Sequence, residues 1–259
     1  MTVLQVRALS KSFGGVHAVN KVNFTVARGE FLAMIGPNGA GKTTCFNMIN
    51  GQLAPDFGEI LFGNKNLAGL APRDIWRLGV GRTFQVAATF HSMTVAENVQ
   101  MALISHAGEI YRFWRAAASQ HRERALDLLA QVGMHAAADR PSRELAYGDV
   151  KRVELAIALA NKPRLLLMDE PTAGLGARER HELIALVKRL VVERGISVLF
   201  TEHSMDVVFA FADRIVVLAR GRLIADGPSA AIRDNAQVRE VYFGTGKTFA
   251  SGTWHGAAS

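Results

Sequence analysis

The sequence predicts an α/β fold: a parallel sheet covered by helices, with an antiparallel β subdomain at the N-terminus and an inserted helical subdomain. Three patterns predict these parts. Residues 1–30 alternate apolar and polar side chains, as strands of an antiparallel sheet do. Residues 94–133 repeat apolar side chains at helical spacing. After Asp149, helical and strand patterns follow each other, which is typical of a parallel sheet.

The N-terminal half contains a buried strand followed by a glycine-rich loop and a helix. Residues 26–36, VARGEFLAMIG, predict a turn and then the strand. The sequence GPNGAGKTT comes directly after it, and residues 43–50 predict a helix that Gly51 closes. Strand, glycine loop and helix in this order are the context that a phosphate-binding loop needs. A turn with a short strand follows at 55–63, and a short helix at 72–78.

The helical subdomain is predicted over about residues 88–150, as an insert in a domain that spans residues 1–244. Thr94 and Glu97 have the spacing of a capping box at the start of a helix. An apolar stripe at helical spacing follows at Ala125, Leu128, Leu129 and Val132. We therefore expect a unit of helices between two parts of the α/β core.

The second half of the sequence returns to the core pattern. It predicts, in order, a helix at 153–160, a strand at 165–168, a helix at 178–192, a strand at 196–201 and a hairpin of residues 215–218 and 223–225. Residues 245–259 are rich in Gly, Ser and Thr and predict a mobile tail. The sequence GTGKT at 244–248 is similar to a second phosphate loop, but Val241 stands where its first glycine is required, so we assign it to the tail.

Composition narrows the class of protein. A hydrophobic fraction of 49% supports a substantial core, yet the longest apolar stretches are far shorter than the ~20 residues that cross a bilayer. The N-terminus lacks the layout of a secretory signal, so we expect the chain to stay in the cytoplasm. Cys45 is the only cysteine, which excludes an internal disulfide and a multi-cysteine zinc site, and we expect it to be a small buried hydrophobe.

The formal net charge of +7 is compatible with nucleic acid, an anionic lipid surface, or a phosphate-rich ligand and good solubility. Basic residues such as Arg178, Arg180, Lys188 and Arg189 are scattered through predicted helices and are not interleaved with stacking aromatics. The composition therefore favours the lipid surface or the phosphate-rich ligand, and we expect no nucleic-acid partner.

The glycine-rich loop carries the strongest functional motif. It matches the pattern G-x4-G-K-[ST] at Gly36, Pro37, Asn38, Gly39, Ala40, Gly41, Lys42 and Thr43. In such a loop, backbone N–H groups face the β-phosphate of a nucleotide and Lys42 reaches the β- and γ-phosphates, so Lys42 is also a catalytic candidate. Thr43 is expected to bind Mg²⁺ through its hydroxyl, and Thr44 to contact the nucleotide. The alternative is a glycine turn without a ligand.

Two carboxylates end the strand LLLMDE, at the edge where open α/β sheets bind their ligands. Asp169 is expected to hold Mg²⁺. Glu170 lies one residue outside the strand and suits a general base that takes a proton from the attacking water.

Four further features resemble motifs of ABC transporter ATPases. Phe13, Gln85, the segment LAYGD at 145–149 and His203 resemble, in that order, the adenine-stacking aromatic, the Q-loop, the signature motif and the switch histidine. The resemblance extends over about residues 4–244. It implies a P-loop NTPase core of ABC type that binds ATP and Mg²⁺.

The resemblance also assigns roles to these residues. Phe13 would stack on adenine, Gln85 would sense Mg²⁺ and the attacking water, and His203 would donate a hydrogen bond to the γ-phosphate. Without the family, the alternatives are a core phenylalanine, a surface glutamine and a structural histidine. Gly148 precedes a helix expected to begin near Val150, and this segment would meet the γ-phosphate that the other subunit of a head-to-tail dimer binds.

The signature segment departs from the usual L-S-G-G-Q of the family. Ala146 replaces the serine, Tyr147 the first glycine and Asp149 the glutamine, so one hydroxyl contact to the γ-phosphate is missing. Gly176 stands where an aspartate is usual after the catalytic glutamate. We expect modest turnover, or one weakened site in a mixed dimer.

Local sequences point to one branch of the family. LAYGD, GRTFQ, FTEHSMDVV and REVYFG are similar to the longer ATPase subunit of branched-chain amino acid importers. This implies a homo- or heterodimer with a second ATPase subunit, two membrane permease subunits, a solute-binding protein that acts indirectly, and a peripheral position on the cytoplasmic face of the membrane. Alternatives are an importer of urea or short amides, a lipid or lipopolysaccharide exporter, and an ABC protein that acts on DNA or ribosomes.

Overall fold

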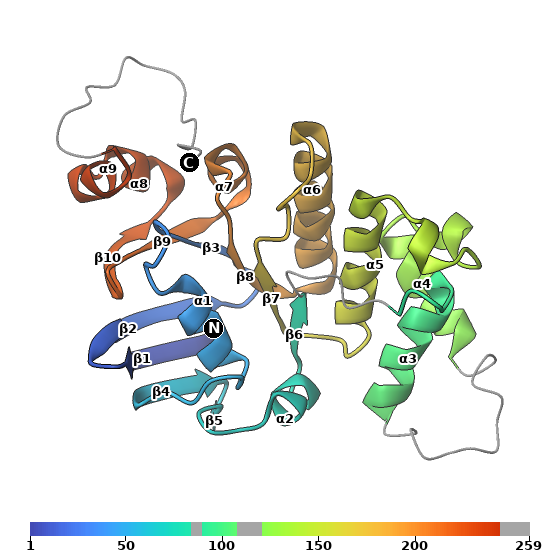
Figure 1. Cartoon of the computed structure of the whole chain (residues 1–259), viewed down its shortest axis with the longest axis horizontal. Helices are drawn as coiled ribbons and strands as arrows, with labels where there is room; N and C mark the ends of the chain where they lie inside the picture. The colour runs from blue at the N-terminus through green and yellow to red at the C-terminus, as the bar shows by residue number, and fades with distance from the viewer. Residues whose placement is uncertain (84–89, 108–120, 244–259) are drawn as a thin grey trace.

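The computed structural model describes residues 1–83, 90–107 and 121–243 of the chain (Figure 1). Gln85 and the predicted tail at 245–259 lie outside these ranges, and the bounds 88–150 of the helical insert stay a prediction. The described residues form two β-sheets with helices between and around them, and a group of helices lies at one end of the molecule (Figure 1).

The N-terminal sheet is antiparallel, as predicted. Its strand order is β2-β1-β4-β5, with β1 at Thr2–Phe13, β2 at Val16–Ala27, β4 at Phe57–Phe62 and β5 at Lys65–Asn66. Buried positions along β1 and β2 alternate with exposed ones, because one face of this sheet packs on the core and the other meets solvent. The alternation read from the sequence is therefore confirmed.

The second sheet has six strands and is parallel apart from one edge. Its order is β10-β9-β3-β8-β7-β6, with β3 at Phe31–Ile35, β6 at Val80–Thr83, β7 at Leu165–Asp169, β8 at Ser197–Thr201, β9 at Arg214–Ala219 and β10 at Arg222–Gly227. Only β10 runs antiparallel, paired with β9 as the predicted hairpin. Every residue of β3, β7 and β8 is buried, which requires cover on both faces.

Two hydrophobic cores lie on opposite faces of this sheet. Phe31, Ala33 and Ile35 of β3 join a core with the helices, whereas Leu32 and Met34 join a core with the N-terminal sheet and the first helix. Alternate residues of a strand point to opposite faces, so one short strand anchors both cores. The loop that follows β3 is thereby fixed between them.

The helices are α1 at Lys42–Ile49, α2 at Pro72–Arg77, α3 at Val95–Ala107, α4 at Arg122–Gln131, α5 at Tyr147–Leu159, α6 at Ala177–Arg194, α7 at Met205–Phe211, α8 at Ser229–Asp234 and α9 at Ala236–Phe243, with 3₁₀ turns at His135–Ala137 and Ser142–Glu144. Helices α3 and α4 pack with α5 at the end of the molecule farthest from the N-terminal sheet (Figure 1). Within the described ranges, none of these helices has the length and apolarity that crossing a membrane requires.

The capping box at the start of α3 is confirmed. The Thr94 N–H donates to Glu97 Oε2 over 2.8 Å, and the Glu97 N–H donates to Thr94 Oγ1 over 3.2 Å. The prediction for α5 was wrong at its start: the helix begins at Tyr147, because the Val150 N–H already donates to the Ala146 carbonyl over 3.0 Å. Gly148 therefore lies inside the first turn and does not precede the helix.

Candidate functional site

The glycine-rich loop, residues 36–43, connects β3 to α1 in a shape that only glycine allows at its tightest points. Gly41 has φ of 101°, and a Cβ there would lie 2.4 Å from the Ala18 carbonyl oxygen. A Cβ on Gly36 would lie 2.2 Å from the Leu218 carbonyl oxygen. Backbone atoms of β2 and β9 thus pack closely against the loop, and this packing restricts the loop to one backbone conformation.

Lys42 lies inside the curve of this loop. Only 7% of the residue is exposed, and its Nζ donates to the carbonyl oxygens of Gly36 over 2.7 Å and Pro37 over 3.2 Å. Burial lowers the pKa of Lys42, while the charges of Glu170 and Asp169 act in the opposite direction. The structure therefore brings the lysine of the loop and the two carboxylates at the end of β7 within electrostatic reach of one another.

Asp169 is buried at the end of β7 and has partners on both carboxylate oxygens. Thr201 donates its hydroxyl hydrogen to Asp169 Oδ1 over 2.6 Å, and Arg82 Nη2 lies 3.6 Å from Oδ2. Burial lowers the pKa of Arg82, and the charge of Asp169 opposes that shift. Arg82 also donates to Asn47 of α1 over 3.1 Å, so it links the acidic strand end to the helix that follows the loop.

Glu170 has a backbone conformation that is uncommon for a residue other than glycine. Its φ is 49°, in the left-handed region, and its N–H donates to Thr201 Oγ1 over 3.0 Å. Its side-chain Oε1 lies 2.8 Å from His203 Nε2. The structure therefore brings together two residues that the sequence predicted separately, and the strained backbone is of the kind found at active sites.

Glu202 is a buried carboxylate that the sequence analysis missed. It contacts Thr172, in the loop that follows Glu170, and it directly precedes His203. A carboxylate at the end of a fully buried strand, beside a predicted site residue, is a signal that the sequence did contain.

Phe13 and Thr43 lie at the surface, and Thr44 lies partly below it. Phe13 ends β1 and is 51% exposed, with Lys11 Nζ 5.8 Å from its ring centroid. Thr43 is exposed and Thr44 half-buried. An exposed aromatic face beside a lysine has room to stack on a planar ring.

The signature segment, residues 145–149, lies apart from the glycine-rich loop in this chain. Tyr147 is 46% exposed, and a Cβ added to Gly174 would lie 3.1 Å from its ring. Gly148 lies against Glu179, which in turn accepts the Gly176 N–H over 3.1 Å. Among the described residues, no hydrogen bond or ion pair joins residues 146–149 to the loop. The signature segment packs instead on the turn that follows Glu170.

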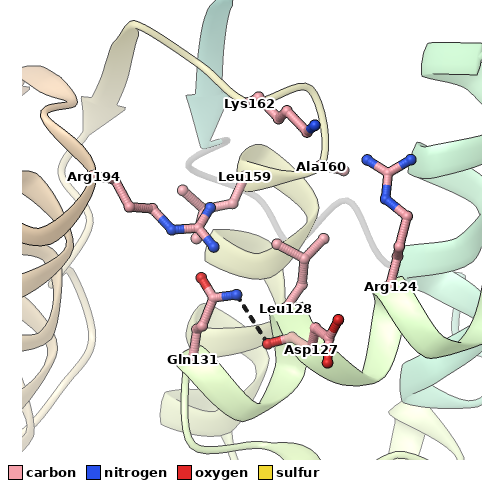
Figure 2. A pocket seen from close by; sticks show the side chains of 8 residues that line it. All are labelled: Arg124, Asp127, Leu128, Gln131, Leu159, Ala160, Lys162 and Arg194. Atoms are coloured by element: carbon pink, nitrogen blue, oxygen red, sulfur yellow. Dashed lines mark hydrogen bonds between the residues drawn. The ribbon is translucent and has the colours of Figure 1, made fainter.

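Two cavities in the described part of the chain differ in size and in distance from the glycine-rich loop. One of about 740 Å³ borders Pro37 and Ala40 of the loop and the turn between β9 and β10. The other, of about 160 Å³, shares no lining residue with the loop and lies among Arg124, Lys162 and Arg194 (Figure 2). Small-molecule sites occupy roughly 300–1,000 Å³, and of these two cavities only the one beside residues 37–40 has that size. Its other lining residues come from the β9–β10 hairpin and α9, and Lys42, Asp169 and Glu170 do not line it.

Comparisons with known proteins agree with this geometry. The family described as ABC transporter matches residues 19–173, and the family described as branched-chain amino acid ATP-binding cassette transporter matches residues 222–248. The chain is 39% identical to the high-affinity branched-chain amino acid transport ATP-binding protein BraF of Pseudomonas aeruginosa, over 93% of this chain and 98% of BraF. It is equally similar, at 39% over 93% of this chain and 98% of the relative, to the corresponding protein LivG of Escherichia coli K12.

Solved structures give the same picture. The ADP conformation of MJ1267, an ATP-binding cassette of an ABC transporter, superposes with a TM-score of 0.85 at 31% identity, over 95% of this chain and all of that one. A dimeric post-hydrolysis state of the cassette MJ0796, bound to ADP and phosphate, has a TM-score of 0.74 at 28% identity, over 87% of this chain and 98% of that one.

Proposed function

The chain belongs to the ABC transporter family, and from that premise we propose that it binds and hydrolyses ATP to power the import of branched-chain amino acids through separate permease subunits. One observation carries the proposal: the buried lysine of a glycine-rich loop lies within electrostatic reach of Asp169 and Glu170, and Glu170 contacts His203. These are the parts that phosphoryl transfer to water needs in one place.

The loop would hold the phosphates of ATP. Its N–H groups and the start of α1 offer donors to an anion, and Lys42 supplies a cation that the loop keeps buried. Phe13 would stack on the adenine from the end of β1.

Thr43 and Asp169 would hold Mg²⁺, and Gln85 is proposed as a third ligand although it lies outside the described residues. Hydroxyl and carboxylate oxygens are suitable donors for this ion. The Thr201 hydroxyl and Arg82 occupy part of the Asp169 carboxylate, which suits a ligand that acts partly through water. When bound, Mg²⁺ would neutralise charge on the phosphates.

Glu170 would act as the general base. It would accept a proton from a water whose oxygen attacks the γ-phosphorus, while the bond from that phosphorus to the bridging oxygen breaks and ADP leaves. His203 lies 2.8 Å from Glu170, where it would orient the carboxylate and donate to a γ-phosphate oxygen. Glu170 has a left-handed backbone, and its side chain lies against His203.

Transport would require a second ATPase subunit. The signature segment lies apart from the loop of its own chain, which fits a role toward a nucleotide bound by a partner subunit, with Ala146, Tyr147, Gly148 and Asp149 meeting its γ-phosphate. The dimeric state of the cassette MJ0796 supports such an arrangement. We place the assembly on the cytoplasmic face of a membrane, with two permease subunits and a solute-binding protein.

The match of residues 222–248 to a family named for branched-chain amino acids favours this cargo over urea or lipids. The test is to co-purify the chain with its native permease subunits, reconstitute the complex with its binding protein in vesicles, and supply ATP on the cytoplasmic side. We expect uptake of labelled leucine that depends on ATP. Uptake of urea alone, or lipid release without amino acid uptake, would contradict the proposed cargo.

A further inference from the structure

Glu202 is a carboxylate with four hydrogen-bond donors and only 3% exposure. Its Oε1 accepts the N–H of Thr172 over 3.0 Å and the hydroxyl of Thr172 over 2.5 Å. Its Oε2 accepts the N–H of His203 over 3.2 Å and that of Ser204 over 3.4 Å. One side chain therefore joins two segments that are distant in sequence: the loop after Glu170 and the segment that carries His203.

Thr201 makes a second connection between the same segments. Its hydroxyl accepts the Glu170 N–H and donates to Asp169, so the ends of β7 and β8 are joined just before Glu170 as well. Hydrogen bonds therefore fix the chain on both sides of the Glu170 side chain. Thr201 bonds to Asp169 and to the Glu170 N–H, and Glu202 bonds to Thr172. Both connections flank the contact between Glu170 and His203, whose side chains lie 2.8 Å apart.

Burying the Glu202 carboxylate lowers the stability of the fold unless hydrogen bonds compensate for the lost contact with water. Burial raises the pKa of Glu202, and the donors from Thr172, Ser204 and His203 oppose that shift. Removing a carboxylate from water costs several kcal/mol unless its hydrogen bonds compensate, and a neutral side chain would avoid this cost. Hydrogen bonds to an ionised acceptor are roughly twice as strong as those between neutral groups, which would hold the two segments together more firmly.

We propose that Glu202 is a positioning residue for ATP hydrolysis, which holds Glu170 and His203 at the separation that the reaction needs. The inference rests on the proposed function, in which Glu170 is the base. Within the described part of the chain, the hydrogen bonds of Glu202 go to Thr172, His203 and Ser204 and to no residue of the glycine-rich loop. Glu202 should therefore affect the rate of the chemical step and leave nucleotide binding unchanged.

The first test is Glu202→Gln. The amide has the shape of the carboxylate, but its N–H₂ group is a donor and cannot accept the hydrogen bonds that Thr172, His203 and Ser204 donate. We expect kcat for ATP to fall by about 10²-fold, the effect of misplacing a catalytic group by about 1 Å, with KM unchanged. Glu193→Gln is the matched control, since Glu193 is exposed and forms a surface ion pair with Arg189, and we expect it to keep wild-type kcat. A normal kcat in Glu202→Gln would overturn the inference.

The second test changes Thr172, first alone and then together with Glu202. Thr172→Val removes the hydroxyl donor and should lower kcat. Thr172→Ser keeps the hydroxyl and should have a kcat close to that of the wild-type chain. Because both residues act through one contact, Glu202→Gln combined with Thr172→Val should be no slower than Glu202→Gln alone. Independent, multiplying losses would overturn the inference, as would equal loss in Thr172→Ser and Thr172→Val.

Binding of Mg-ATP, measured by calorimetry on each variant, separates this inference from the proposed function. If the wild-type chain binds no ATP, the proposed function fails. If the wild-type chain binds and hydrolyses ATP and the Glu202 and Thr172 variants do so at the same rate, only the positioning role fails. Thermal unfolding of each variant shows whether a lost rate reflects a lost fold.

Discussion

His203 Nε2 lies 2.8 Å from Oε1 of Glu170, although 33 residues separate the two positions in the sequence. The two side chains leave the ends of neighbouring parallel strands, β7 and β8, which pair from Leu165 and Ser197 to Asp169 and Thr201. The register of this pairing places a carboxylate and an imidazole side by side at the edge of the sheet where the glycine-rich loop lies.

Glu170→Gln should slow ATP hydrolysis by two orders of magnitude or more while leaving ATP binding intact. A general base contributes about 10²–10⁴-fold, and the amide cannot accept the proton of the attacking water. Steady-state hydrolysis and calorimetric binding of Mg-ATP measure the two properties separately. Normal turnover in this variant would remove Glu170 from the role of base.

Lys42→Ala should abolish nucleotide binding, because it deletes the buried cation of the glycine-rich loop and the hydrogen bonds of that cation to Gly36 and Pro37. Lys65→Ala is the matched control, since Lys65 is exposed on β5 of the N-terminal sheet. We expect this variant to bind ATP normally. Calorimetry with Mg-ATP checks both variants. Tight binding by Lys42→Ala would contradict the role given to the loop.

Gly41→Ala should destabilise the chain more than Gly39→Ala, although both glycines lie in the same loop with positive φ. At Gly39 a Cβ meets open space, so only backbone strain of about 1–2 kcal/mol is added, a loss of roughly 2–8 °C in Tm. At Gly41 the same atom would also lie 2.4 Å from the Ala18 carbonyl oxygen. Thermal unfolding without nucleotide measures the difference, and equal Tm values would show that β2 does not constrain the loop.

Cys45 should resist alkylation until the chain unfolds. Burial raises the pKa of its thiol to about 12, so the reactive thiolate forms only as the pH approaches that value. At pH 8 roughly one thiol in 10⁴ is ionised in the folded chain, against roughly a quarter in an unfolded one. Labelling with iodoacetamide at pH 8, with and without denaturant, tests this. Equal labelling rates would mean that α1 opens readily or that Cys45 is accessible.

The fold was predictable from the sequence wherever a pattern was long or contiguous. The alternation of β1 and β2, the capping box at Thr94 and the buried strands β3, β7 and β8 all follow from local rules, and the structure confirms them. Helices α7, α8 and α9 were not predicted. They have only six to eight residues, too few for helical periodicity to stand out. Helices α1 and α2 are equally short, but the glycine-rich loop and Pro72 marked where they start.

In the candidate site too, the residues of contiguous motifs were predictable and the contacts between distant segments were not. The loop is a contiguous motif, and its residues could be named from the sequence. The contacts of Arg82 with Asp169 and of Glu202 with Thr172 could not be predicted, because they exist only once β6, β7 and β8 pair side by side. The start of α5 was misplaced because Ala146 offers no side-chain cap, so the sequence lacks the usual N-terminal signal.

The most direct test of the account is a crystal structure of the Glu170→Gln chain with saturating Mg-ATP. We expect the phosphates to lie against the backbone of residues 36–43, with Lys42 turned toward the γ-phosphate and Mg²⁺ held by Thr43 and Asp169. A nucleotide bound elsewhere on the chain, with Lys42 still directed at the carbonyl oxygens of Gly36 and Pro37, would contradict it.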